Sequence, residues 1–145
     1  MCLNNDTIEV ICHKLCTELG LSNSAIFYRR VISAFFFRVF EVWMERRGNN
    51  PEKGFKEKEF MDDMIRFANN NIQLRECLIT LYLYRTLADH FYDFGNGYKG
   101  VNFYYAESTV KGPRDYGPLG KKECGEAYNC MLRLLEALGK NTTRI

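Results

Sequence analysis

Apolar side chains recur at helical spacing along most of the chain, and the longest such segment runs from about 24 to 47. Apolar residues occupy nearly every face of this segment as far as Met44, and four charged residues interrupt them there: Arg29, Arg30, Arg38 and Glu41. A helix that is apolar all round lies inside a bundle or lends one face to a partner subunit. A membrane span would have to carry the four charges at bilayer depth, where each is costly. The pattern therefore predicts a central bundle helix and no membrane association.

The same periodicity predicts helices in four other segments, at about 6–20, 55–67, 72–94 and 121–138. Segments rich in Gly, Pro and Asn separate the helices, at 48–54, 69–71 and 95–97, and such residues end helices or form turns. Gly139 stands where the last helix is expected to stop.

Between the fourth and fifth helices the character of the sequence changes, over about 96–120. The stretch 101–110, VNFYYAESTV, is rich in β-branched and aromatic residues and predicts a strand or a short hairpin. The stretch 111–120, KGPRDYGPLG, is rich in Gly and Pro and predicts an exposed loop. We therefore expect a single, mainly α domain over 1–145, a bundle of about five helices with a small strand and loop insert before the last helix.

The composition predicts one packed core, and the small net charge excludes a strong overall electrostatic field. The chain has 145 residues, of which 46% are hydrophobic and 14% are aromatic, and this is enough for one domain. Its 20 basic and 18 acidic residues leave a formal charge of +2, so no global field attracts nucleic acid or an anionic membrane. The N-terminal segment lacks the pattern of a signal peptide, and we expect the protein to be cytoplasmic.

Six cysteines are present, and in a chain of this size and location we expect reduced thiols. The segment 12–16, Cys-His-x-x-Cys, places two thiols one helical turn apart beside an imidazole, and it would recruit zinc if Cys124 or Cys130 came near. The alternative is that these thiols are small buried residues, which the absence of a four-ligand spacing favours. We therefore expect no metal and no cofactor.

One motif has a definite chemistry. Near the end of the fourth helical segment, Arg85 precedes His90 by five residues. An imidazole titrates near neutral pH, so His90 is able to move a proton at an RNA 2′-hydroxyl or at the leaving oxygen. A guanidinium donates in a fixed fork, so Arg85 is able to hold the scissile phosphate. Five residues subtend about 140° on an ideal helix, so the pair converges only if the helix ends or bends near His90.

This motif resembles the R-x4-6-H motif of HEPN domains, a family of small helical bundles that includes many bacterial toxin and defence ribonucleases. The order of elements is similar over nearly the whole chain, with the motif late in a helix, then a variable segment, then one more helix. The resemblance implies a metal-independent endoribonuclease that acts on RNA as a homodimer, with two motifs facing across a cleft. It also implies a role as a toxin or defence effector, with an antitoxin or regulatory protein as partner.

On this resemblance Arg85 and His90 are the candidate catalytic residues, with Thr86, Asp89 and Tyr92 as supporting residues. Family members often carry Asn, Asp or another polar residue directly after the arginine, where this chain has Thr86. The structural alternative is an ion pair between Arg85 and Asp89, which are four residues apart on a helix, together with a histidine packed among neighbouring aromatic rings.

A second group of residues is a weaker candidate for binding single-stranded RNA by ring stacking and phosphate contacts. Its members are Tyr98, Lys99, Lys111, Arg114, Lys121 and Lys122. The alternative is a solvated loop with a few packed rings. The sequence contains no Walker loop, dinucleotide fingerprint, Gly-x-Ser-x-Gly or His-Glu-x-x-His motif. If the chain is not a ribonuclease, we expect a non-catalytic helical module that binds a partner protein or a nucleotide.

Overall fold

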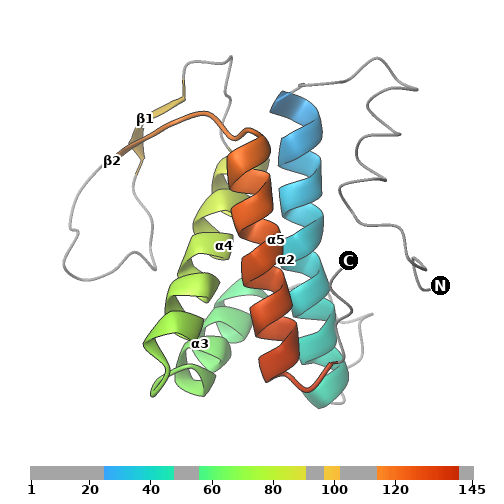
Figure 1. Ribbon diagram of the computed structural model, residues 1–145. Helices are drawn as coiled ribbons and strands as arrows, with labels where there is room; N and C mark the ends of the chain where they lie inside the picture. Colours follow the sequence, from blue (N-terminus) through green and yellow to red (C-terminus); the bar gives the residue numbers. More distant parts are fainter. Residues whose placement is uncertain (1–24, 48–55, 91–96, 102–113, 141–145) are drawn as a thin grey trace.

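The computed structural model of the protein describes residues 25–47, 56–90, 97–101 and 114–140. In chain order the elements are α2 (Ala25–Arg47), α3 (Glu57–Phe67), α4 (Ile72–His90), β1 (Tyr98–Val101), β2 (Arg114–Tyr116) and α5 (Lys121–Ala137). The long helices α2, α4 and α5 lie side by side, and each packs against the other two (Figure 1). The short helix α3 lies at one end of this bundle and the two strands lie at the other (Figure 1).

The mainly α fold predicted from the sequence is confirmed, with the strand insert before the last helix. The described residues contain four helices against the five or so expected, and the helix expected at 6–20 lies outside them. None of the helices in this part of the chain combines the length and the apolar character that a bilayer crossing requires.

The core lies where the three long helices meet, and α2 contributes most of its aromatic side chains. The largest fully buried side chains are Ile32, Phe36, Val39, Val42, Phe60, Met61, Met64, Leu78, Leu81, Leu87, Leu119 and Leu134. Phe60 of α3 meets three aromatic rings of α2 edge-on, with centroid distances of 5.4 Å to Phe36, 5.5 Å to Phe40 and 5.3 Å to Trp43. Edge-to-face packing of this kind is favourable beyond the area it buries, and it fastens α3 to α2.

Local signals set the helix ends. The Asn71 side chain accepts a hydrogen bond of 3.0 Å from the backbone N–H of Leu74, so the last of three consecutive asparagines caps α4. The carboxylate of Glu123 accepts a bond of 3.1 Å from the backbone N–H of Gly120 at the start of α5. Gly139 has a φ of 84°, and this left-handed conformation ends α5 where the sequence predicted.

The strands form an antiparallel pair in which Tyr98 lies opposite Tyr116 and Val101 opposite Arg114, with an irregular register between them. Of the predicted strand segment 101–110, only Val101 lies among the described residues, and it is the last residue of β1, whereas β2 lies in a segment predicted to be a loop. At the entrance to β1, Gly97 has a φ of 81°, and a Cβ atom there would lie 2.4 Å from the carbonyl oxygen of Tyr116. Only glycine fits this close approach of the two strands.

Candidate functional site

Arg85 lies on the side of α4 that faces α2 and α3. It is 7% exposed, the one charged residue among the buried residues of the described segments. Its guanidinium carbon lies 5.1 Å from the ring centroid of Phe36 and 5.2 Å from that of Phe37. The consecutive phenylalanines of α2 thus provide ring faces for a cation, and the cation–π attraction is strongest away from water.

Two carboxylates bind the same guanidinium. Arg85 Nε donates to Asp89 Oδ2 at 2.8 Å, and Arg85 Nη1 donates to Glu57 Oε1. Asp89 Oδ2 also accepts a bond of 3.1 Å from the hydroxyl of Ser33 on α2. The ion pair between Arg85 and Asp89 that the four-residue spacing predicted is therefore present. The arginine of this pair is buried beneath Phe36 and Phe37, whereas the side chain of Asp89 is 18% exposed.

The second carboxylate extends this cluster to α3. Glu57 is the first residue of α3, where the positive end of the helix dipole favours an acidic side chain. Its pair with Arg85 joins the start of α3 to the end of α4, and Asp89 joins the end of α4 to α2 through Ser33. The guanidinium consequently links three helices and has its charge offset by two acidic partners.

A second arginine lies at the same end of α4. Arg29 of α2 donates from Nε to the carbonyl oxygen of Ala88 at 2.9 Å and from Nη2 to that of Leu87 at 3.4 Å. The last carbonyls of a helix lack partners within the helix and carry its negative dipole end, so a cation there is stabilising. This role of Arg29 was not predicted from the sequence. The available signal was a charge inside an otherwise apolar helix.

The structure places the two predicted catalytic residues in different surroundings. His90 is exposed, and it is the last residue of α4, whereas Arg85 is buried beneath aromatic rings and bound to two carboxylates. The hydroxyl of Thr86 donates to the carbonyl oxygen of Tyr82 in its own helix at 2.8 Å. Asp89 is a partner of Arg85, and Tyr92 lies outside the described residues.

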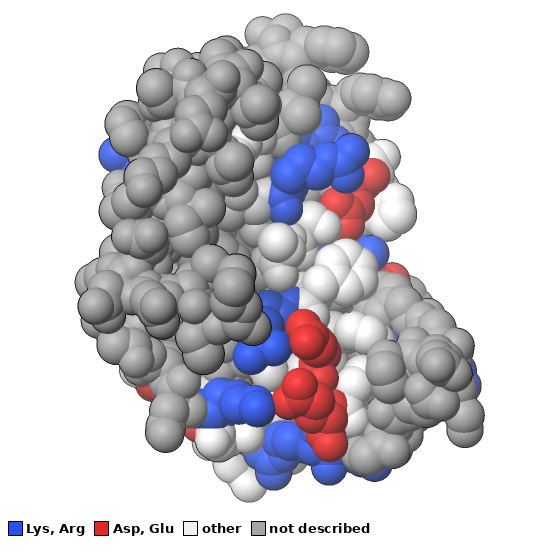
Figure 2. All heavy atoms as spheres, turned by 90° about the vertical axis from the view of Figure 1, so that its right-hand side faces the viewer, with Lys and Arg blue, Asp and Glu red and all other residues white. Residues whose placement is uncertain are grey.

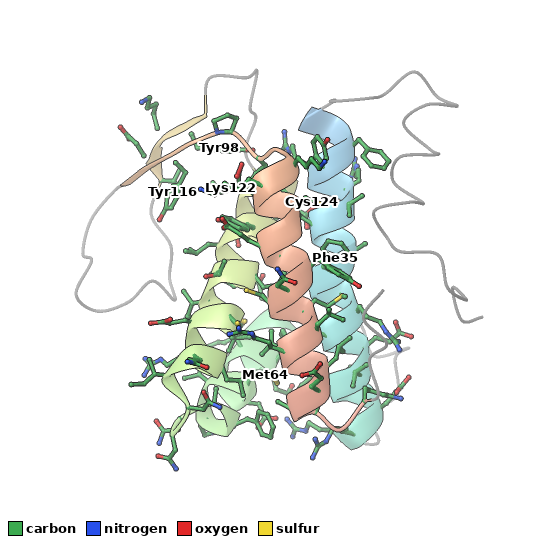
Figure 3. The ribbon with its side chains drawn as sticks, viewed as in Figure 1. Phe35, Met64, Tyr98, Tyr116, Lys122 and Cys124 are labelled. Carbon is green, nitrogen blue, oxygen red and sulfur yellow. The ribbon has the colours of Figure 1, made fainter. Side chains whose placement is uncertain are left out.

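Among the described residues proposed to bind single-stranded RNA, one is buried and two lie near carboxylates. Tyr98 is 2% exposed, so its ring packs in the core and is not available for base stacking, which corrects the prediction for this residue. Lys99 pairs with Asp115 at 3.5 Å, and Lys122 lies 4.0 Å from a carboxylate oxygen of Glu126. Figure 3 shows Tyr98, Tyr116 and Lys122 at the strand end of the bundle.

The remaining members of that group add little to such a surface. Lys121 is exposed on the first turn of α5, Arg114 belongs to β2, and Lys111 lies outside the described residues. On the face seen in Figure 2, acidic side chains lie beside basic ones within the part that the structure describes. The described part of that face, which lies away from the strands, does not present the continuous positive potential that a nucleic-acid backbone needs.

A different candidate site lies between α4 and α5. A shallow open groove of about 450 Å³ lies between the two helices, and six of its eight lining residues have polar or charged side chains. The lining residues are Gln73, Glu76, Cys77 and Thr80 on α4, and Glu126, Asn129, Cys130 and Arg133 on α5. Sequence periodicity did not single out these residues, because they come together only through the pairing of two distant helices.

Next to this groove, a short hydrogen bond joins the two helices. The hydroxyl of Tyr84 on α4 donates to Glu126 Oε2 on α5 at 2.5 Å. Burial raises the pKa of the Tyr84 hydroxyl, and the bond to Glu126 raises this pKa further because it favours the protonated phenol. Tyr84 therefore remains a donor across the neutral range and holds Glu126 in place at the groove.

The thiols in this region are paired with each other and not with a metal site. Cys77 and Cys130 are both buried, and a hydrogen bond connects their side chains. Burial raises the pKa of the Cys130 thiol to about 12, and the neighbouring Cys77 adds to this increase. Across the described segments, no three His, Cys, Asp or Glu side chains are arranged to hold a metal ion. Cys12, His13 and Cys16 lie outside these segments.

Comparison of the chain with protein-family models, with curated proteins and with solved structures gives no match. The resemblance to HEPN domains stays a prediction from the sequence.

Proposed function

We propose that this chain is a non-catalytic helical module that binds an extended segment of a partner protein in the groove between α4 and α5. The observation that supports the proposal is the lining of this groove. Both walls carry exposed or half-exposed hydrogen-bonding side chains, including Gln73, Glu76 and Thr80 on α4 and Asn129 and Arg133 on α5. Amides, hydroxyls and charged groups in two parallel rows suit the alternating donors and acceptors of a peptide.

The charge of the groove favours a peptide over a nucleotide. Glu76 and Glu126 contribute two carboxylates, and Arg133 contributes the only guanidinium among the lining residues. A phosphate would therefore meet net negative charge, whereas a segment with lysine or arginine would be attracted. The groove is also open to solvent and carries several charged and amide side chains, unlike the enclosed apolar cavities that hold small molecules.

The surroundings of Arg85 support a structural role for that residue. Its guanidinium has Glu57 and Asp89 as partners and lies between two phenylalanine rings. A phosphate would have to compete with both carboxylates for a residue that is only 7% exposed, and removing a partner from a buried charge costs about 3–5 kcal/mol. A catalytic role is therefore less consistent with this geometry than a role in holding α2, α3 and α4 together.

The test is a selection of random 12-residue peptides, displayed on phage, against the immobilised full chain. We expect enrichment of peptides that contain Lys or Arg, with dissociation constants in the micromolar range that are typical of such modules. Glu76→Lys reverses a charge in the groove and should weaken the selected peptides at least tenfold, roughly 1.4 kcal/mol. Glu41→Lys is the matched control, because Glu41 is exposed on α2 and does not line the groove. Peptides that lose affinity equally in both variants, or in neither, would contradict the proposal.

A second proposal is the metal-independent RNA cleavage predicted from the motif, and one observation favours it. His90 is exposed at the end of α4, close in sequence to the two carbonyls that Arg29 caps, so an accessible imidazole lies near a second guanidinium. In this proposal the chain acts as a homodimer on RNA, as a toxin or defence effector regulated by an antitoxin or similar protein. We place the protein in the cytoplasm under both proposals.

Incubation of labelled RNA with the full chain and a chelator separates the two proposals. Cleavage would give products with 2′,3′-cyclic phosphate ends, and His90→Ala should abolish this reaction while the fold stays intact. Intact RNA with the unmodified chain, or full cleavage by His90→Ala, would end the ribonuclease proposal. Neither result would affect peptide binding in the groove.

A further inference from the structure

Cys77 and Cys130 come from different helices, α4 and α5, and meet at the floor of the groove between them. Both are free thiols, 7% and 9% exposed, and a side-chain hydrogen bond connects them. Because both residues line the groove, a small molecule that enters it reaches both sulfur atoms. The peptide-binding proposal does not use this pair, and the following inference does not depend on it.

We propose that Cys77 and Cys130 form an oxidation site, at which a small peroxide in the groove converts the two thiols into a disulfide that joins α4 to α5. In a reducing compartment such a disulfide is transient and forms only under oxidative stress. The geometry supports this pair because a disulfide joins side chains that are already close together, and Cys77 and Cys130 are joined by a hydrogen bond and line the same groove.

The reaction has two steps. In the first, the sulfur of Cys77, having lost its proton, attacks one oxygen of hydrogen peroxide. The O–O bond breaks, Cys77 becomes a sulfenic acid, and the departing hydroxide takes up the thiol proton to give water. In the second, the sulfur of Cys130 attacks the sulfur of Cys77. The S–S bond forms, the S–OH bond breaks, and the hydroxide leaves with the Cys130 proton as a second water.

The environment of Cys130 determines this order. Burial and the neighbouring Cys77 raise the pKa of Cys130 to about 12, so this residue stays a thiol near neutral pH. The thiolate is the nucleophile toward peroxide, so a residue that holds its proton this tightly is poorly suited to the first attack. In the second step Cys130 gives up its proton to the leaving hydroxide as its sulfur attacks. We therefore assign the first attack to Cys77 and the resolving step to Cys130.

Cys124 provides a matched control on the same helix. It is half-buried, and it packs against the hydrophobic core without lining the groove. Its thiol lies two turns of α5 before Cys130, so it shares the helix but not the contact with Cys77. Substitution of Cys124 should leave the oxidation of the pair unchanged.

The test treats the reduced full chain with equimolar hydrogen peroxide and digests it with trypsin without reductant. Cleavage after Arg75, Arg85, Lys122 and Arg133 releases peptides 76–85 and 123–133, which contain Cys77 and Cys130 respectively. In Cys124→Ser the second peptide holds a single cysteine, so the linkage is unambiguous. We expect these two peptides joined, with the mass of two hydrogen atoms lost, as the dominant product in both the unmodified chain and Cys124→Ser.

Thermal unfolding provides a second measurement. A disulfide that closes a long loop restricts the unfolded chain, and we expect the melting temperature of the oxidised protein to rise by on the order of 5–10 °C. The joined peptides and the rise should both disappear in Cys77→Ser and in Cys130→Ser. A dominant linkage between other cysteines, or oxidation of either peptide without linkage, would overturn the proposal. The peptide map of Cys124→Ser decides this even if Cys77→Ser or Cys130→Ser fails to fold.

Discussion

The two sides of α4 use polar residues in opposite ways. On the side toward α2 and α3, Arg85 lies beneath aromatic rings with both of its carboxylate partners supplied by the protein. On the side toward α5, the preceding residue Tyr84 bonds to Glu126, next to a groove whose walls are polar and open. Two consecutive residues thus belong to different environments, because successive positions on a helix are about 100° apart.

The difference distinguishes polar groups that hold the fold from polar groups that are available to a ligand. A buried charge with two partners is costly to disturb, whereas an exposed side chain in a groove contributes little to stability and is open to binding. A motif defined by sequence spacing alone does not separate these cases. Arg85 and His90 satisfy the spacing of a ribonuclease motif, yet only His90 is exposed.

The largest expected effect is on the buried side. Arg85→Met removes the cation while keeping most of the side-chain volume, so Glu57 and Asp89 lose their shared partner. We expect the free energy of unfolding to fall by about 3 kcal/mol, measured by urea denaturation with circular dichroism. His90→Ala, five residues away and exposed, should change it by less than about 0.5 kcal/mol. Equal changes in the free energy of unfolding would contradict the conclusion that Arg85 stabilises the fold and His90 does not.

A smaller effect is expected where α4 meets α5. Tyr84→Phe deletes the hydroxyl that donates to Glu126 and should lower the free energy of unfolding by about 1 kcal/mol. Glu126→Gln keeps an acceptor oxygen, so it should lower the free energy of unfolding by less than Tyr84→Phe does in the same urea titration. If Glu126→Gln proves the more damaging change, the contribution of Glu126 lies in its charge rather than in this bond.

The packing of α4 against α5 should become less stable in alkaline solution. The pKa of Cys130 is raised by folding from 9.0 to about 12, so the folded state binds its proton more tightly than the unfolded state. This contribution to stability is complete below pH 9.0 and is lost as the pH rises toward about 12. The raised pKa of Tyr84 acts in the same direction. Urea titrations at increasing pH should show the loss, and Cys130→Ala should make it less steep.

The smallest effect is expected on the open wall of the groove. Arg133 is exposed on α5, so Arg133→Ala should change the free energy of unfolding by less than about 0.5 kcal/mol. Thermal denaturation of this variant beside the unmodified chain measures the change. A decrease of more than about 1 kcal/mol in the free energy of unfolding would indicate that this wall of the groove stabilises the fold. The two sides of α4 would then not differ in the way described.

The helices were predictable from the sequence because their signals are local. The apolar period of α2, the asparagines before α4 and the glycine after α5 lie within or beside the elements that they define. The strand pair was only partly predictable. β2 is a strand because its backbone pairs with β1, with Tyr116 opposite Tyr98. This pairing brings together two segments that are apart in the sequence, so the composition of either segment alone does not predict it.

The candidate site was predictable to the same limited extent. The spacing of Arg85 and Asp89 predicted their ion pair, since both lie on one helix. The spacing could not predict Glu57 as the second partner, because Glu57 belongs to α3 and reaches Arg85 only through tertiary packing. The pairing of Cys77 with Cys130 depends in the same way on how α4 and α5 are rotated about their axes.

Trp43 is the single tryptophan of the chain, and it lies where α2 meets α3. Its indole N–H donates to Asp63 at 2.6 Å, and the guanidinium carbon of Arg47 lies 5.0 Å from the ring centroid. All ultraviolet emission excited at the red edge of the indole band therefore originates from one known position, far along the bundle from the strands. The protein carries an intrinsic optical reporter of α3 docking, which needs no dye or label.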